Sequence, residues 1–316
     1  MRGCVAVCLA LGGLALLLGC RPGMQDGPPE KMTVAVSIIP QAWLVEQIGG
    51  EHVEAIALVK PGDSCEVYQP TDAQVSRIMA AKVFFRIGMP FEDGHGFRAI
   101  ESSGKMRIVD TRRGITLRDM AGHVHAPEAS GPGASAGSSE KERRAADAEG
   151  GKDPHVWLSP RLLSLQARTI AQTLGELDPS HQEDYDRHLR ALQQRLGEVD
   201  QSIRAKLAPL RGKTFFVFHP AWGYFADEYG LRQVAIETAG KEPSDRELTE
   251  LQNEARREGV KVIFVQPQTS KRAAEAVAGA IRGRVEILDP LLPDVAANLL
   301  HAAESLAESY RGGAPR

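Results

Sequence analysis

The chain has 316 residues, of which 25% are charged and 5% are aromatic, and its formal net charge is -3 at pH 7. No concentrated basic segment is present, which excludes nucleic acid as a partner, and the few aromatic residues argue against a surface that stacks on sugars or bases. The length exceeds that of one typical domain and leaves room for two α/β lobes.

The N-terminus has the pattern of an export signal. Arg2 precedes the apolar run 5–18, which is too short for a typical membrane-spanning helix, and the chain turns polar after Cys20. Leu17-Leu-Gly-Cys20 resembles a bacterial lipobox, so we expect residues 1–19 to be cleaved, Cys20 to carry lipid and residues 20–30 to form a tether. An ordinary cleaved signal without lipid is the alternative. Either reading predicts an extracytoplasmic location.

Strand-like and helix-like segments alternate along residues 31–178, which predicts a mainly parallel sheet with helices on both sides. The expected strands are 33–38, 53–59, 83–87 and 107–109, and the expected helices are 41–48, 72–81 and 160–177. Residues 120–152 interrupt this pattern, because they are rich in Gly, Ala, Ser and charge and contain almost no apolar residue. His123 and His125 lie there, either as an accessory metal-collecting pair or as two solvated histidines.

A long amphipathic helix is expected near residues 180–207, where apolar residues from Tyr185 to Leu207 recur every three or four positions. We expect residues 179–209 to link two lobes. The alternation then resumes in residues 210–316, with expected strands at 214–218, 233–236, 260–265 and 285–288 and expected helices at 222–229, 244–258, 270–281 and 294–310. The predicted fold is therefore α/β, with two lobes that each hold a four-stranded sheet, joined by one rigid helix.

Metal-capable side chains stand at the ends of two expected strands. His219 directly follows strand 214–218, Asp289 directly follows strand 285–288, and His155 precedes the helix at 160. Ligands bind outside the carboxyl ends of strands in open α/β sheets. These three residues therefore predict an assembled site, although strand-end residues that cap nearby backbone would give the same pattern.

Several motifs in the same order resemble the metal-specific solute-binding proteins of zinc and manganese ABC transporters, the ZnuA- and TroA-like family. They are Asp153-Pro-His-Val-Trp-Leu-Ser-Pro160, the run from His219 to Leu231, Glu242-Pro-Ser244, the run from Gly259 to Val265, and Leu288-Asp-Pro-Leu291. The resemblance implies two lobes joined by a long helix, with a metal ion in the cleft between them. It places ligands at His155, His219, Asp289 and one position in a loop after the second strand.

That loop is where this chain departs from the family pattern. The family has a histidine at the position that Glu66 occupies here, within Lys60-Pro-Gly-Asp-Ser-Cys-Glu-Val-Tyr-Gln-Pro-Thr71. Three alternatives stay open: Glu66 is the ligand, Cys65 is the ligand, or water completes the site. Neighbouring side chains of an extended segment point to opposite sides, so Cys65 and Glu66 are not both expected in the cleft, and the register favours Glu66.

The resemblance implies a lipid-anchored protein that captures a divalent transition metal and delivers it to the permease of an ABC importer. Zinc is the expected metal, while a carboxylate at position 66 would favour manganese or iron more than a histidine does. We expect a monomer. The rivals are a metal-binding adhesin or storage lipoprotein of the same fold and a metallohydrolase. A hydrolase is disfavoured because the chain has no HExxH motif and no nucleophile elbow between an expected strand and an expected helix, and Glu237 and Glu242 are assigned to surface or turn roles.

Overall fold

The computed structural model describes residues 31–65, 67–120, 151–237, 241–269 and 271–311.

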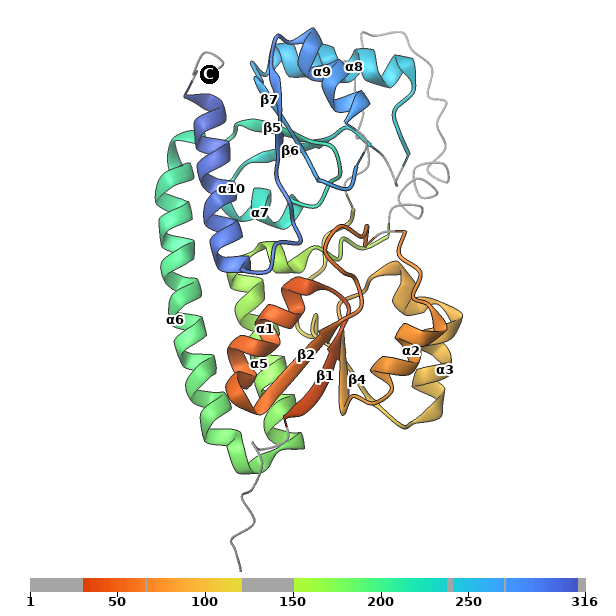
Figure 1. Ribbon diagram of the computed structural model, residues 1–316. Helices are drawn as coiled ribbons and strands as arrows, with labels where there is room; N and C mark the ends of the chain where they lie inside the picture. The colour runs from red at the N-terminus through yellow and green to blue at the C-terminus, as the bar shows by residue number, and fades with distance from the viewer. Residues whose placement is uncertain (1–30, 66, 121–150, 238–240, 270, 312–316) are drawn as a thin grey trace, which may run out of the picture. The chain divides into compact units, whose positions relative to one another are not determined.

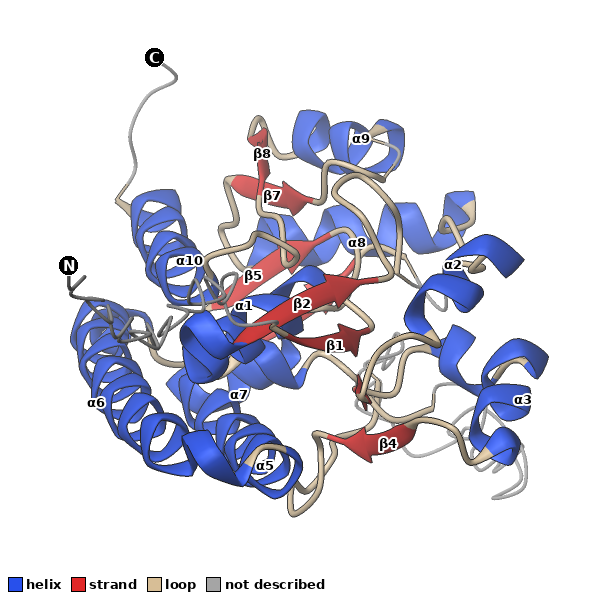
Figure 2. Ribbon diagram, turned by 60° about the horizontal axis from the view of Figure 1, so that its bottom comes forward, coloured by secondary structure: helices blue, strands red, loops and turns tan. Residues whose placement is uncertain are grey.

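The first sheet contains four parallel strands. The strands are β1 (Met32–Val36), β2 (Val53–Ala57), β3 (Val83–Arg86) and β4 (Arg107–Asp110), in the order β2-β1-β3-β4. The helices α1 (Ile39–Gly49) and α5 (Pro160–Leu177) lie on one side of this sheet, and α2 (Asp72–Ile78) and α3 (His95–Ser103) lie on the other (Figures 1 and 2).

The second sheet repeats this topology with the order β6-β5-β7-β8. Its strands are β5 (Thr214–Val217), β6 (Arg232–Ala235), β7 (Val262–Val265) and β8 (Arg284–Ile287). Its helices are α7 (Gly223–Tyr229), α8 (Asp245–Arg257), α9 (Arg272–Ala280) and α10 (Val295–Tyr310). Side chains alternate across β5, so Phe216 packs with α8 and α9 while Phe215 packs toward α7 and α10.

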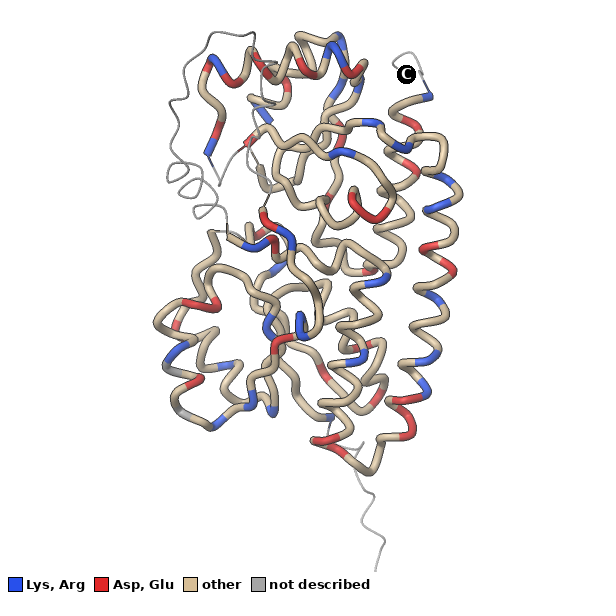
Figure 3. The backbone as a smooth tube through the Cα atoms, turned by 180° about the vertical axis from the view of Figure 1, so that it is seen from behind, with Lys and Arg blue, Asp and Glu red and all other residues tan. Residues whose placement is uncertain are grey.

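The helix α6 (Gln182–Leu207) links the two lobes and packs against α1 and α5 of the first lobe and α10 of the second (Figure 1). Its 26 residues span about 39 Å at 1.5 Å per residue. The predicted apolar stripe is buried from Tyr185 to Leu207, apart from Leu189, which is partly buried. Groups of acidic and of basic residues follow one another along the helix (Figure 3).

One hydrophobic core crosses from the first lobe to the second. A single cluster of buried residues includes Val36 of β1, Leu196 of α6, Phe215 of β5 and Leu299 of α10. Close-packed interiors resist deformation, so this shared core holds the segments that carry the candidate ligands in a fixed arrangement. Residues Lys31–Arg316 accordingly form one compact unit, and the predicted domain boundaries at 178 and 209 stay predictions.

The predicted fold class is confirmed. All eight strands are present, and the helix at 160–177 has the predicted bounds. The helix α3 is not among the expected helices; its N-cap residue, Gly94, has no side chain that could cap it. No helix in the described part of the chain combines the length and the apolar character needed to cross a bilayer.

Candidate metal centre

His155 is held by the carboxylate two residues before it. The His155 side chain is 1% exposed and that of Asp153 is 0% exposed. Asp153 Oδ1 accepts a hydrogen bond from the His155 backbone N–H at 3.0 Å and lies 2.7 Å from the imidazole Nδ1. This contact assigns the hydrogen of the neutral ring to Nδ1 and leaves Nε2 with an available lone pair.

His219 follows β5 and is held in the same way. Its Nδ1 forms a short hydrogen bond with Oε1 of Glu237, a buried residue just after β6. The expected surface or turn role of Glu237 is therefore wrong, because this carboxylate orients a histidine. The surface role expected for Glu242 is confirmed, since Glu242 is exposed and pairs with Arg272 at 2.9 Å.

The two imidazoles face each other through their Nε2 atoms. Nε2 of His155 lies 3.3 Å from Nε2 of His219, and the ring planes meet at 65°. A carboxylate accepts the hydrogen on each Nδ1, so a hydrogen bond between the two Nε2 atoms requires an additional proton on one ring. A metal ion can take the place of that proton.

The spacing of the two nitrogens fits a shared metal ion. Two nitrogens that each lie about 2.0–2.1 Å from one tetrahedral zinc ion are separated by about 3.3–3.4 Å. The outer carboxylates add the usual support of a metal-binding histidine, since they fix the ring orientation and raise the basicity of the ligand nitrogen. The geometry of His155 and His219 therefore fits a pair of ligands to one metal ion.

Asp289 lies just after β8, as the sequence predicts, and is tied to the segment of His155. The carbonyl oxygen of Pro290 accepts a 2.8 Å hydrogen bond from the indole N–H of Trp157. Asp289 Oδ1 accepts from the backbone N–H of Leu291 at 2.9 Å, and the Asp289 carbonyl accepts from Asn298 at 2.8 Å. Burial raises the pKa of the Asp289 carboxyl, and the hydrogen bond from Leu291 partly opposes this shift.

The described residues do not contain a complete set of ligands. No group of three or more His, Cys, Asp or Glu side chains within the described ranges could hold a metal ion, so Asp289 is not clustered with the two histidines. Glu66, His123, His125 and Cys20 lie outside the described residues. Their predicted roles stay predictions.

Cys65 and His155 line one cavity of about 380 Å³. Cys65 is 3% exposed and also packs in the hydrophobic core. Met89, Met120 and Pro154 also line this cavity. Two of the candidate ligands, one in the loop after β2 and one before α5, therefore border the same space.

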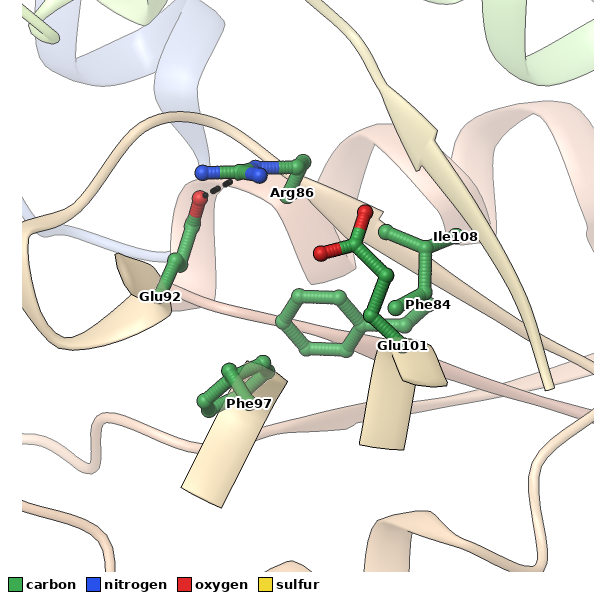
Figure 4. A pocket seen from close by; sticks show the side chains of 6 residues that line it. All are labelled: Phe84, Arg86, Glu92, Phe97, Glu101 and Ile108. Atoms are coloured by element: carbon green, nitrogen blue, oxygen red, sulfur yellow. Dashed lines mark hydrogen bonds and ion pairs between the residues drawn. The ribbon is translucent and has the colours of Figure 1, made fainter. Parts of the chain in front are cut away.

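A second cavity of about 10 Å³ lies away from the histidines, among Phe84, Arg86, Glu92, Phe97, Glu101 and Ile108 (Figure 4). This volume is about what one water molecule needs, which is too small for a ligand of more than a few atoms. The carboxylate of Glu92 pairs with Arg86 at 3.1 Å and also accepts from the backbone N–H groups of Ile87 and Gly88. Glu92 thus fixes the turn after β3 that lines the larger cavity.

The two carboxylates that hold the histidines are not among the residues predicted for the site. The position of Asp153, two residues before His155, is the sequence signal that indicates a role in orienting the ring. Glu237 is separated from His219 by 18 residues, and their contact depends on the pairing of β5 with β6.

Two lobes with repeated topology and a buried pair of imidazoles that face each other define a metal-binding protein of the two-lobed α/β class. The chain belongs to the family described as zinc-uptake complex component A, periplasmic, whose model matches residues 34–309. This family is named as a component of an uptake complex, which agrees with the prediction of a binding protein rather than an enzyme.

Individual proteins support this assignment. The high-affinity zinc uptake system protein ZnuA of Bacillus subtilis is 27% identical over 273 residues, which cover 85% of this chain and 81% of that protein. The structure of a zinc-bound deletion mutant of ZnuA is 33% identical with a TM-score of 0.76, over 90% of this chain and 100% of that one. The laminin-binding protein of Streptococcus agalactiae shares the fold, at 24% identity and a TM-score of 0.72, over 88% of this chain and 99% of that one.

Replacing Glu237 by Gln tests whether the outer carboxylate supports His219. The neutral amide no longer raises the basicity of the imidazole, so we expect zinc affinity to fall by about 10- to 100-fold. Competitive titration with a chromogenic chelator measures this change. Glu242→Gln is the matched control and should bind like the wild type; an unchanged affinity in Glu237→Gln would contradict the assigned role.

Replacing Asp289 by Asn tests the free-energy cost of its half-buried charge. Because the pKa of Asp289 is raised in the folded state, the folded protein binds more protons than the unfolded chain between the two pKa values, and stability falls as pH rises through that window. Metal-free Asp289→Asn should therefore melt on the order of 1–2 °C above wild type at pH 7, with the difference vanishing near pH 4. Thermal unfolding followed by circular dichroism measures this, and a lower melting temperature at pH 7 would count against it.

Proposed function

We propose that this protein captures a divalent transition metal outside the cytoplasm and delivers it to an ABC importer. The observation that carries the proposal is the pair of buried imidazoles, each held at Nδ1 by a carboxylate, with the Nε2 atoms 3.3 Å apart. Membership of the periplasmic zinc-uptake family supports the same function.

The proposed ligands are His155, His219, Asp289 and one residue of the loop after β2. For that fourth position the alignment of the loop supports Glu66, whereas the cavity that Cys65 shares with His155 supports the thiolate. Either residue supplies one negative charge. Together with Asp289 and two neutral imidazoles, the site would therefore neutralise a divalent cation.

Zinc is the proposed metal. Imidazole nitrogens suit zinc better than manganese, and the separation of the two Nε2 atoms fits a tetrahedral ion. A thiolate from Cys65 would strengthen the preference for zinc, while a carboxylate from Glu66 would make manganese or iron more competitive.

The proposal also covers how the protein is attached to the membrane and whether it acts as a single chain. We propose that Cys20 carries the lipid that anchors the protein, that the protein acts as a monomer, and that residues 31–178 and 210–316 behave as two lobes. The partner would be the permease of the importer.

An adhesin or storage protein of the same fold is the second candidate, and transport measurements separate it from an importer component.

The ligand set is tested by metal analysis and competitive zinc titration of purified variants. His155→Ala and His219→Ala should each lose at least about 100-fold in zinc affinity, because each removes a direct ligand. If Glu66 is the fourth ligand, Glu66→Ala should also lose affinity and Cys65→Ser should not; the reverse result assigns the position to Cys65. His301→Ala removes an exposed histidine of α10 and serves as the control. Unchanged zinc binding in both His155→Ala and His219→Ala would contradict the site.

Delivery to an importer is tested in cells that lack this protein. We expect uptake of radioactive zinc at limiting concentration to fall, and wild-type protein and His301→Ala to restore it. His155→Ala and His219→Ala should not restore uptake. Normal zinc uptake in the deletion strain would favour a storage or adhesive role.

A further inference from the structure

An arginine that touches neither histidine connects the segments that carry them. Arg118 lies between β4 and the antiparallel bridge of Asp119 with Lys152. Resting on the metal site proposed above, we propose that Arg118, together with Tyr224 of α7, is a positioning residue that fixes the separation of the His155 and His219 imidazoles.

Hydrogen bonds of the Arg118 backbone and of the Tyr224 hydroxyl connect the segment of His155 with the segment of His219. The Arg118 backbone N–H donates to the Tyr224 hydroxyl at 3.1 Å, and that hydroxyl donates to the Asp153 carbonyl at 2.9 Å. The Asp153 backbone N–H donates to the Arg118 carbonyl at 3.0 Å. Burial raises the pKa of Tyr224 to about 12, so its hydroxyl stays protonated and can donate. The segment before His155 is thus joined to the helix that follows His219.

The Arg118 side chain faces the free oxygen of Asp153. Asp153 uses Oδ1 for His155, and its Oδ2 lies 3.6 Å from a terminal guanidinium nitrogen of Arg118. Neither of these two buried atoms has a hydrogen-bond partner in the described part of the chain. The positive guanidinium of Arg118 attracts this second oxygen and so favours the carboxylate orientation in which Oδ1 faces His155. Arg118 Nε also pairs with Asp227 of α7 at 3.2 Å.

The first residue of α7 leaves the space that Arg118 needs. A Cβ atom at Gly223 would overlap the Arg118 guanidinium and would lie 3.0 Å from Asp153 Oδ2. Gly223 comes four residues after His219 in the chain. The contact between Arg118 and Asp153 therefore depends on the local conformation that also places His219. Because His155 depends on Asp153, Arg118 couples the positions of both imidazoles.

The experiment compares Arg118→Ala, Arg118→Lys and Tyr224→Phe with wild type. We expect Arg118→Ala to lose about 10-fold in zinc affinity, in the range for supporting residues around a metal site. Lysine retains the charge without the planar fork and should recover part of the loss. Tyr224→Phe removes one hydroxyl and should lose about two- to tenfold, which tests the proposal if Arg118→Ala does not fold.

Two further measurements separate positioning from general stability. The visible spectrum of the Co²⁺-loaded protein should change in Arg118→Ala, because displaced imidazoles alter the coordination geometry. Arg195→Ala is the matched control, since Arg195 of α6 pairs with Asp294 near α10 at 3.2 Å and lies over the ring of Trp43, and neither partner belongs to the segments of His155 and His219. It should leave zinc affinity and the Co²⁺ spectrum unchanged.

Wild-type zinc affinity and an unchanged Co²⁺ spectrum in Arg118→Ala and Tyr224→Phe would overturn the positioning role. So would an equal loss of affinity in Arg195→Ala, because the effect would then follow stability alone. Failure of the wild-type protein to bind zinc would instead overturn the proposed function, so the two failures are distinguishable.

Discussion

The candidate site depends on two hydrogen bonds between an imidazole Nδ1 and a buried carboxylate. Asp153 holds His155 and Glu237 holds His219, and each bond directs an Nε2 lone pair toward the same point. The two Nε2 atoms approach to 3.3 Å, a distance at which two lone pairs repel unless a cation lies between them. The rest of the structure keeps these four side chains in place and out of water.

The fold supports this arrangement because its two sheets share one hydrophobic core. α6 packs against both lobes, and Trp157 connects the turn after His155 to the loop of Asp289 by a hydrogen bond to Pro290. Arg118 and Tyr224 add a polar connection between the same two lobes, next to Asp153. These connections hold the segments of His155 and His219 together, as a site in which two imidazoles share one metal ion requires.

Much of the fold follows from periodic patterns in the sequence. Alternating β-rich and amphipathic segments predict both sheets, and the three- and four-residue spacing from Tyr185 to Leu207 predicts the helix between them. The positions of His219 and Asp289 just after β5 and β8 could be predicted from strand patterns, while the role of Asp289 as a ligand stays a prediction. Glu237 could not be predicted, since its contact with His219 arises only when β5 and β6 pair. The choice between Glu66 and Cys65 depends on side-chain direction within one loop, which residue order does not determine.

The most direct test of the paired imidazoles is X-ray absorption at the zinc edge on the zinc-loaded protein. The account predicts two histidine nitrogens at about 2.0–2.1 Å from one zinc ion, with multiple-scattering features of two imidazole rings. Loss of one imidazole from the spectrum of His155→Ala and of His219→Ala would assign the two rings. A zinc environment without histidine, or one that neither substitution changes, would contradict the account.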